Sequence, residues 1–466
     1  MPMEAVNPAT GELIASYEET TDAEVDAALD AAVEAFDGWR RRSFGERAAL
    51  LTAAAATLRD RRRAYAEVIT GEMGKPITQA EAEVEKCAWV CDFYAENAGA
   101  MLCPEPIASD ATESHVAFPP LGPVLAVMPW NFPFWQLFRF AAPALMAGNV
   151  AILKHAGNVP GCALAIEDAF TAAGLPTGVF RTLLVGSDRV AGMIADPRVA
   201  AVTLTGSEAA GVSVGGAAGS AIKPAVLELG GSDPYIVLAD ADVAEAAAVA
   251  VTARNQNAGQ SCIAAKRFIV DSAVAEEFVA RFAEGVAALS MGDPMDPETQ
   301  VGPMARGDLR DALAAQVSAS IAAGAAVRTG GWAEPGPGFY YAPTVLTGVT
   351  AAMPAWREET FGPVAAVATC DGADQAVALA NDTPFGLGAS LWTADIELGR
   401  RLASEIQAGS VFINGMVASD PRLPFGGVKR SGYGRELSGF GIREFVNVQT
   451  VWVGPRRSPG PVAQAE

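Results

Sequence analysis

The stretch VLAVMPWNFPFWQLFRFAAPALMAGNVAILKH, residues 124–155, alternates a short apolar run, an amphipathic segment and a second apolar run. The runs Val124–Met128 and Val150–Leu153 have the length and composition of buried strands, and a helix is predicted between them from about Pro133. Similar runs and amphipathic segments alternate as far as Leu204. Strands that alternate with crossover helices are typical of a parallel sheet, so we expect an α/β fold.

The chain around this unit is long enough for more than one domain. Its 466 residues exceed the size at which a single hydrophobic core keeps growing. The first part of the chain has apolar side chains at helical spacing, and a second series of apolar runs and amphipathic segments extends from Gly231 to about Gly409. We therefore predict two α/β domains and a largely helical N-terminal segment.

The charge balance limits the partners that the chain could bind. Its 54 acidic residues outnumber its 33 basic ones, which gives a formal net charge of -21. Because such a field repels phosphate, we expect no nucleic-acid partner and no membrane partner. The uncharged stretch 119–138 contains five prolines and fits a strand and a helix better than a membrane span. Residues 1–16 lack the pattern of an export signal, so the cytoplasm is the predicted location.

Six scattered cysteines and two histidines predict neither a disulfide scaffold nor a metal site. Cys262, in the run GQSCIAAKR at 259–267, is nevertheless the strongest candidate for chemistry. A thiolate can attack an aldehyde or ester carbon, and Glu228, in LELGG at 227–231, could activate the water that releases the acyl group. The alternative is that Cys262 is a small buried apolar residue, as many isolated cysteines are.

Two predicted strand-to-helix turns could contact a ligand. In PWNFP, at 129–133, the Asn131 amide would lie at the carboxyl edge of the parallel sheet, where it could donate to a developing oxyanion. The alternative for Asn131 is a helix cap. In TGSEAAG, at 205–211, backbone N–H groups and a helix N-terminus could hold a pyrophosphate. The glycine spacing of this turn is not the usual one, and a plain turn is the alternative.

Taken together, seven ordered motifs make the chain similar to the aldehyde dehydrogenase superfamily from Asn7 to about Trp452. The runs AAKR at 264–267 and NGM at 414–416, with the compact length, resemble the short succinate-semialdehyde dehydrogenases of that family. The seven motifs are PWNFP at 129–133, Lys154, TGS at 205–207, LELGG at 227–231, GQSC at 259–262, ETFGP at 359–363 and PFGGVKRSG at 424–432.

The resemblance implies a role for each matching position. Cys262 would be the nucleophile, Glu228 the base, and Asn131 with the Cys262 backbone N–H the oxyanion hole. A thiohemiacetal on Cys262 would lose hydride to nicotinamide, and the resulting thioester would be hydrolysed to a free acid. The residues implied to contact the cofactor are Trp130, Lys154, Gly157, Gly206, Ser207, Leu229, Glu359 and Phe361.

The position three residues after Lys154 bears on the choice of cofactor. An acid there would bind the ribose hydroxyls of NAD and repel the 2′-phosphate of NADP, but this chain has Gly157. We therefore expect NADP to be preferred, with NAD also admitted. Many NADP-preferring relatives have serine at this position, from which Gly157 departs. The alternative for Lys154 is an ordinary surface lysine.

Two further residues are candidates for binding a substrate carboxylate. Arg139 lies eight residues beyond Asn131 on the predicted helix, with Trp135 midway, so the three side chains could point to one side. Ser419 lies in the loop before PFGG, where similar semialdehyde dehydrogenases have a carboxylate-binding hydroxyl. The alternatives are a solvated or salt-bridged helix residue for Arg139 and a plain turn serine for Ser419.

The sequence thus predicts an enzyme that oxidises succinate semialdehyde to succinate with NADP or NAD. A broader aldehyde dehydrogenase, acting on glutarate semialdehyde or on medium-chain or aromatic aldehydes, is the alternative within this chemistry. A non-catalytic protein on the same fold is a third hypothesis, against which the set Asn131, Glu228 and Cys262 argues.

The resemblance also implies the architecture, namely two Rossmann-type parallel-sheet domains and a small β oligomerisation arm. The assembly implied is a homodimer or a homotetramer. The predicted parts are an NAD(P)-binding domain at 1–109 and 124–231, a catalytic domain at 232–420, the arm at 110–123 and 434–453, and a mobile tail at 454–466.

Overall fold

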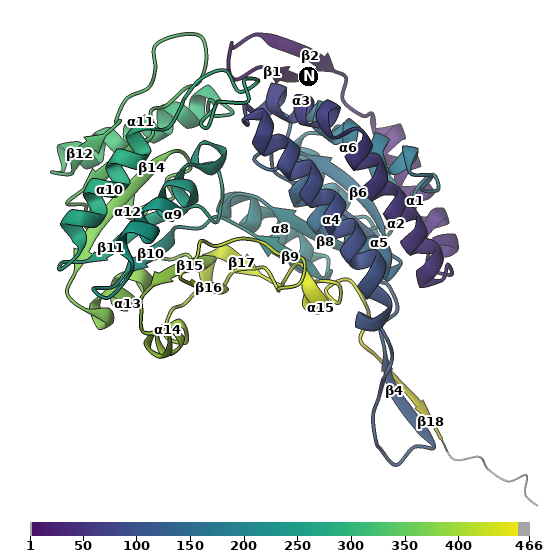
Figure 1. Ribbon diagram of the computed structural model, residues 1–466. Coiled ribbons are helices and arrows are strands. Elements are labelled where there is room, and N and C mark those ends of the chain that lie inside the picture. Colours follow the sequence, from purple (N-terminus) through teal and green to yellow (C-terminus); the bar gives the residue numbers. More distant parts are fainter. Residues whose placement is uncertain (1, 455–466) are drawn as a thin grey trace, which may run out of the picture.

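The computed structural model describes residues 2–454, which form two large sheets, two small sheets and the helices around them (Figure 1). Apart from Gly454, the predicted tail at 454–466 lies outside the described residues. None of the helices in residues 2–454 is both long enough and apolar enough to cross a membrane.

The first large sheet contains the opening stretch of the sequence analysis. Its strand order is β17-β9-β8-β5-β6-β7, and all neighbours are parallel except the short β17, which is antiparallel to β9. The predicted strand, helix and strand are present, which confirms the α/β fold. The elements are β5 (Pro123–Met128), α5 (Trp135–Ala147), β6 (Val150–His155), α6 (Pro160–Ala172), β7 (Phe180–Thr182), α7 (Val190–Ala195), β8 (Ala201–Thr205), α8 (Glu208–Ser220), β9 (Ala225–Glu228) and β17 (Gly432–Tyr433).

Four N-terminal helices cover this sheet and share its hydrophobic core. The first two begin at capping boxes, in which Thr21 and Ser43 each exchange hydrogen bonds with a glutamate three residues later. The fourth packs against both α2 and α5, so it lies directly behind the PWNFP turn. The four helices are α1 (Asp22–Trp39), α2 (Phe44–Asp60), α3 (Arg62–Met73) and α4 (Ile77–Met101).

The second large sheet has the order β12-β13-β14-β11-β10-β15-β16, in which only the edge strand β12 is antiparallel. Helices α9 and α10 belong to the apolar core on one face, and α11 to α14 to the core on the other. The elements are α9 (Val243–Asn255), α10 (Ala275–Ala287), α11 (Gly307–Ala322), α12 (Pro354–Arg357), α13 (Ala373–Asn381), α14 (Ile396–Ala403), β10 (Asp233–Val237), β11 (Ala265–Asp271), β12 (Ala326–Thr329), β13 (Thr344–Thr347), β14 (Val364–Cys370), β15 (Gly388–Trp392) and β16 (Ser410–Ile413).

The small three-stranded sheet has the order β18-β4-β3 and projects from the rest of the molecule (Figure 1). Its strands are β3 (Glu105–Pro106), β4 (Glu113–Ala117) and β18 (Gln449–Val453). Between β17 and β18 the chain forms the short helix α15 (Ser438–Gly441). The domain boundaries of the sequence analysis stay a prediction.

An N-terminal hairpin of β1 (Met3–Val6) and β2 (Leu13–Tyr17) joins the two halves of the molecule outside the sheets. Its turn reaches the loop before β13, where the Phe339 N–H donates a hydrogen bond of 2.8 Å to the Pro8 carbonyl. The hairpin therefore bridges the N-terminal helices and the second large sheet (Figure 1).

The predicted ligand-binding residues lie at the carboxyl ends of the parallel strands in the first large sheet. Trp130 follows β5, Lys154 is near the end of β6, Gly206 follows β8, and Glu228 ends β9. Parallel strands present their carboxyl ends at one edge, which is where α/β proteins bind ligands.

Gly409 lies just before β16 of the second large sheet. It packs closely against the loop that leads to β17 of the first large sheet. A Cβ on Gly409 would overlap the Gly426 carbonyl oxygen, which belongs to the loop that leads back to β17. We expect Gly409→Ala to lower the unfolding temperature, since overpacking of this kind costs about 1–3 kcal/mol. Thermal unfolding followed by circular dichroism measures the change.

Gly415→Ala is the matched control, because no heavy atom lies within 4 Å of a Cβ built on Gly415. If both variants unfold at the same temperature as the wild-type protein, the contact between Gly409 and the Gly426 carbonyl is not tightly packed.

Candidate active site

A cavity of about 850 Å³ opens at the carboxyl edge of the first sheet and reaches the Cys262 loop. This volume is in the upper range of ligand sites. The predicted residues that line the cavity are Trp130, Asn131, Lys154, Gly206, Ser207, Leu229, Cys262, Glu359 and Phe361. Gly157 is exposed just beyond the lining residue Ala156. Glu228, Arg139 and Ser419 are buried but are not among the residues that line the cavity, and they are described below.

The Cys262 loop connects α9 to β11 through a tight turn. Asn257, Ala258 and Gly259 all have positive φ, between 50° and 69°. At Gly259 a Cβ would overlap the Gly362 backbone, so both the conformation and the close approach require glycine. This turn holds Cys262 at the floor of the cavity.

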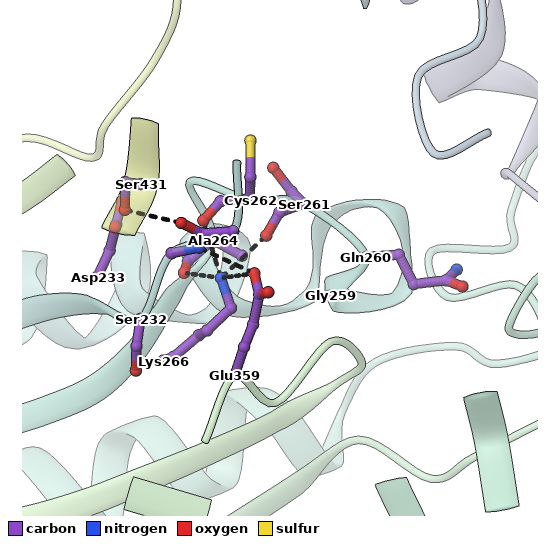
Figure 2. A network of polar contacts seen from close by, with 12 residues as sticks. Ser232, Asp233, Gly259, Gln260, Ser261, Cys262, Ala264, Lys266, Glu359 and Ser431 are labelled. Carbon is purple, nitrogen blue, oxygen red and sulfur yellow. Dashed lines mark hydrogen bonds and ion pairs between the residues drawn. The ribbon is translucent and has the colours of Figure 1, made fainter. Parts of the chain in front are cut away.

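Lys266 is completely buried beneath the Cys262 loop. Its ammonium donates to the carbonyls of Ser261 at 3.1 Å and of Cys262 at 2.8 Å, and more weakly to that of Ala264 at 3.4 Å. Figure 2 shows that the Cys262 sulfur points away from this ammonium, on the other side of the loop. Lys266 therefore fixes the backbone that carries the thiol and leaves the sulfur free to react. Lys266 belongs to the AAKR run at 264–267, but nothing in that run indicates a role for its side chain.

Burial raises the pKa of the Cys262 thiol to about 12. The positive charges of Arg139 and Lys266 act in the opposite direction and favour the thiolate. At neutral pH the resting group is therefore a thiol, and a base must accept its proton during attack.

Glu228 is 2 % exposed, and neither of its carboxylate oxygens has a hydrogen-bond partner in residues 2–454. Burial raises its pKa well above the ordinary carboxyl value, while the charge of Arg139 opposes the rise. A Cβ at Gly426 would lie 2.7 Å from Glu228 Oε1, so the carboxylate lies directly against that glycine. An unpartnered carboxyl group with a raised pKa can accept a proton near neutral pH.

Asn131 does not cap α5, which was the alternative to its role at an oxyanion. The backbone N–H groups of Phe134 and Trp135 donate instead to the Glu83 carboxylate, each at 2.9 Å. Glu83 is in turn paired with the buried Lys75. The Asn131 amide donates to the Gln260 carbonyl at 3.1 Å, two residues before the candidate nucleophile. Asn131 is therefore attached to the Cys262 loop.

Glu359 and Phe361 reach the cavity from the second domain. Glu359 accepts a hydrogen bond of 3.0 Å from the Gly231 N–H. It also lies 3.6 Å from the Lys266 ammonium (Figure 2). The Phe361 ring meets the Trp130 ring edge to face, with centroids 5.7 Å apart. These contacts link the predicted cofactor residues of both domains.

Lys154 is 8 % exposed and lines the cavity, so the alternative of an ordinary surface lysine does not describe it. Desolvation lowers its pKa, and the nearby Asp188 acts in the opposite direction. Asp188 also lines the cavity and had no signal in the sequence. Ser207 caps α8 by accepting from the Ala210 N–H at 3.3 Å, so that helix begins at the cavity wall.

Arg139 is 1 % exposed and ion-paired with Glu436 through Nε. Its guanidinium lies 4.3 Å from the Phe425 ring centroid, and Nη2 is 3.4 Å from Thr205 Oγ1, which lines the cavity. In this structure Arg139 is therefore a salt-bridged helix residue, which was the alternative to a carboxylate-binding role. Its salt bridge is buried, and its guanidinium reaches a residue of the cavity wall.

Ser419 is 7 % exposed and accepts a hydrogen bond of 2.8 Å from the Lys86 ammonium. The alternative of a plain turn serine is therefore incomplete, because the Ser419 hydroxyl has a charged hydrogen-bond partner. Lys86, on α4, was missed by the sequence analysis because nothing in the helical pattern relates it to a loop 333 residues away. Within residues 2–454, no three His, Cys, Asp or Glu side chains are grouped as metal ligands would be.

Comparisons with known proteins agree with this geometry. The family model described as "Aldehyde dehydrogenase family" matches residues 1–451. A probable NADP(+) succinate-semialdehyde dehydrogenase of Synechocystis sp. is 55% identical over 97% of this chain and 100% of its own length. NADP(+) succinate-semialdehyde dehydrogenase 1 of Mycobacterium tuberculosis is 53% identical over 97% of this chain and 100% of its own.

A solved structure is similar over the same length. Succinic semialdehyde dehydrogenase from Streptococcus pyogenes, in complex with NADP+ as the cofactor, superimposes with a TM-score of 0.95 at 36% identity. The match covers 97% of this chain and 100% of that one. By its sequence over nearly its full length and by its fold, the chain belongs to the aldehyde dehydrogenase family.

Proposed function

We propose that this chain oxidises succinate semialdehyde to succinate, with NADP+ as the preferred hydride acceptor and NAD+ as a second one. The observation that carries the proposal is that Cys262 and Asn131 line the same large cavity, that Asn131 is hydrogen-bonded to the Cys262 loop, and that the buried Glu228 carboxylate acts on the pKa of the Cys262 thiol. The relatives named above support the choice of substrate and cofactor, because they match the chain from end to end.

The reaction begins when the Cys262 sulfur attacks the aldehyde carbon and the thiol proton passes to the Glu228 carboxylate. The Asn131 amide and the Cys262 backbone N–H donate to the oxyanion of the thiohemiacetal. A bound nicotinamide would supply the acceptor for the hydride that this tetrahedral carbon loses. After it has released the thiol proton to solvent, Glu228 takes a proton from water as the water attacks the thioester. It returns this proton to the departing Cys262 thiolate, which yields succinate and the free thiol.

The cavity residues fit a dinucleotide with a 2′-phosphate. Lys154 presents a buried ammonium to the cavity, and at Gly157 no heavy atom lies within 4 Å of a built Cβ. A cation beside open space suits a phosphate, and an acid that would repel it is absent at position 157. The start of α8 and the Glu359 carboxylate would hold the remaining phosphate and ribose groups.

We also propose that the chain forms a homodimer or homotetramer in the cytoplasm. The projecting sheet and the residues next to its strands expose apolar side chains that a monomer would leave in water, among them Trp452 in β18 at 52 % and Ile107, just after β3, at 51 %. Val448, just before β18, is 65 % exposed. Apolar surface concentrated on a projecting sheet is typical of a subunit contact.

A steady-state panel tests the proposed function. With NADP+ as cofactor, the wild-type protein is expected to have a higher kcat/KM for succinate semialdehyde than for hexanal or benzaldehyde. With succinate semialdehyde as substrate, its kcat/KM for NADP+ is expected to exceed that for NAD+. Absorbance of the reduced nucleotide at each substrate concentration gives the values. Equal or higher kcat/KM for the neutral aldehydes would favour the broader aldehyde dehydrogenase.

Glu228→Gln tests both roles of the carboxylate. The variant is expected to show a slower first burst of reduced cofactor and to turn over about 10²–10⁴-fold more slowly, because the thiol lacks its proton acceptor and the thioester lacks its base. Since the base is the ionised form, the wild-type rate falls as pH drops through the raised pKa of Glu228, and the variant lacks this limb. Stopped-flow absorbance from pH 5 to 9 measures both effects.

A burst at the wild-type rate in Glu228→Gln, with only the steady-state rate lowered, would contradict the first of these roles and would restrict Glu228 to hydrolysis of the thioester. Glu436→Gln tests whether a neighbouring buried carboxyl group could account for the pH limb.

Lys266→Met removes a positive charge beneath the nucleophile. The thiol pKa should rise further, so iodoacetamide should alkylate Cys262 about tenfold more slowly at a fixed pH, which corresponds to one pKa unit. The alkylation rate as a function of pH, followed by mass spectrometry of the Cys262 peptide, provides the measurement. The control is Lys223→Met, whose ammonium contacts the Asp196 carbonyl. An unchanged alkylation profile in Lys266→Met would show that Lys266 has no influence on the thiol.

A further inference from the structure

The Asn257 side chain joins the two segments that carry the proposed oxyanion donors. Its Nδ2 donates to the Asn131 carbonyl at 2.8 Å and to the Gln260 carbonyl at 3.1 Å. The first carbonyl belongs to the turn between β5 and α5, and the second belongs to the loop between α9 and β11 that carries Cys262. One amide group therefore links the two segments.

The Asn131 side chain completes this network. Its Nδ2 donates to the same Gln260 carbonyl at 3.1 Å, so this oxygen accepts from both amides. Within residues 2–454, Gln260 is the one acceptor of the Asn131 amide. Because an amide nitrogen carries two hydrogens, the second one on Asn131 is free for an oxyanion, whereas both hydrogens of Asn257 are used. Asn257 therefore holds Asn131 and is not itself an oxyanion donor.

The oxygen of the Asn257 amide shows that the nitrogen is the functional end of this side chain. Asn257 is 1 % exposed, and its Oδ1 has no hydrogen-bond partner in residues 2–454. A buried acceptor without a partner costs free energy, and an apolar side chain would avoid that cost. The two contacts of the nitrogen are therefore the ones that explain an amide at this position.

The backbone of Asn257 offers another explanation for the residue type. Its φ is 56°, in the left-handed region that asparagine tolerates better than most residues. The next residue, Ala258, has a φ of 50° in the same turn, so the conformation alone does not require an amide. The two explanations differ in what Asn257→Gly would do, because glycine keeps the conformation and removes the amide.

Helix α4 also holds both segments, through two side chains that are one turn apart. Gln79 accepts a hydrogen bond of 2.8 Å from the Asn257 N–H. Glu83 accepts the N–H groups of Phe134 and Trp135 at the start of α5. The main chains of the two segments are thus attached to one helix, and the Asn257 amide adds a direct link between them.

We propose that Asn257 is a positioning residue for the oxyanion hole, and that it holds the Asn131 amide in place against the Cys262 loop. The inference rests on the proposed function, in which the Asn131 amide and the Cys262 N–H donate to the same oxygen. Donors of this kind are effective only when they are already in place as the charge develops. Asn257 is not among the residues that line the cavity, so it acts through Asn131.

Asn257→Gly tests the inference. The rate of the first burst of reduced cofactor with succinate semialdehyde and NADP+ is expected to fall about 10–100-fold, because a misplaced donor stabilises the oxyanion poorly. Alkylation of Cys262 by iodoacetamide should keep its wild-type rate, since that reaction depends on the thiolate and forms no oxyanion. Stopped-flow absorbance and mass spectrometry of the Cys262 peptide measure the two rates.

Ala258→Gly is the matched control, because it makes the same kind of backbone change at a φ of 50° and removes only a methyl group. It should leave both rates unchanged. If Asn257→Gly does not fold, as judged by circular dichroism at the assay temperature, Asn257→Ala provides the same test. Ala258 shows that alanine adopts the required conformation in this turn.

A double-mutant cycle distinguishes positioning from a general structural role. Asn131→Ala is expected to lower the burst rate about 10²–10³-fold, as when one oxyanion donor is lost. Adding Asn257→Gly should leave the rate at the Asn131→Ala value, because the donor to be positioned is gone. Multiplied effects of the two substitutions would overturn the proposal, and so would an equal loss of the alkylation rate in Asn257→Gly.

Failure of the proposed function would look different from failure of this inference. A wild-type burst rate in Asn131→Ala would remove the oxyanion role that Asn257 is inferred to support. A wild-type burst rate in Asn257→Gly, together with a large loss in Asn131→Ala, would overturn the role of Asn257 alone.

Discussion

The buried ammonium of Lys266 is the interaction on which the rest of the site depends. It donates hydrogen bonds to the carbonyls of Ser261 and Cys262 and lies near the Glu359 carboxylate. Glu359 in turn accepts a hydrogen bond from the Gly231 N–H. Three segments that are far apart in the chain are thus held at one point: the nucleophile loop, the end of the first sheet and the loop before β14. An apolar side chain at position 266 would leave these acceptors buried without donors, which costs about 1–3 kcal/mol for each group.

The electrostatics of the site follow from burial opposed by a few positive charges. Burial raises the pKa of both Cys262 and Glu228, so both groups are protonated more than in water. The Arg139 guanidinium acts against both shifts, and its own charge is moderated by Glu436. Burial and the Arg139 charge therefore act on the thiol and on the carboxyl group in the same two opposing directions. This balance suits a group that must act as acceptor in two successive steps.

Much of this arrangement could be predicted from the sequence, because it depends on local patterns. The runs around 124–155 correctly predicted strand, helix and strand, and ordered motifs predicted the residues that line the cavity. What could not be predicted are pairings between distant segments, such as Arg139 with Glu436 and Lys86 with Ser419. Asn131 shows the same limit: its residue type fits a cap, but the cap of α5 is Glu83, from another helix. Local propensity cannot reveal which side chain arrives from elsewhere.

The N-terminal hairpin has a consequence for the whole cleft. Its turn is hydrogen-bonded to Phe339 of the second domain, while its strands lie beside the helices of the first. The amino end thus restrains, from outside, how widely the half that holds Lys154 and the half that holds Cys262 can separate. A fusion partner attached there, or deletion of the hairpin, would alter the spacing between cofactor and sulfur without changing a single residue that touches either.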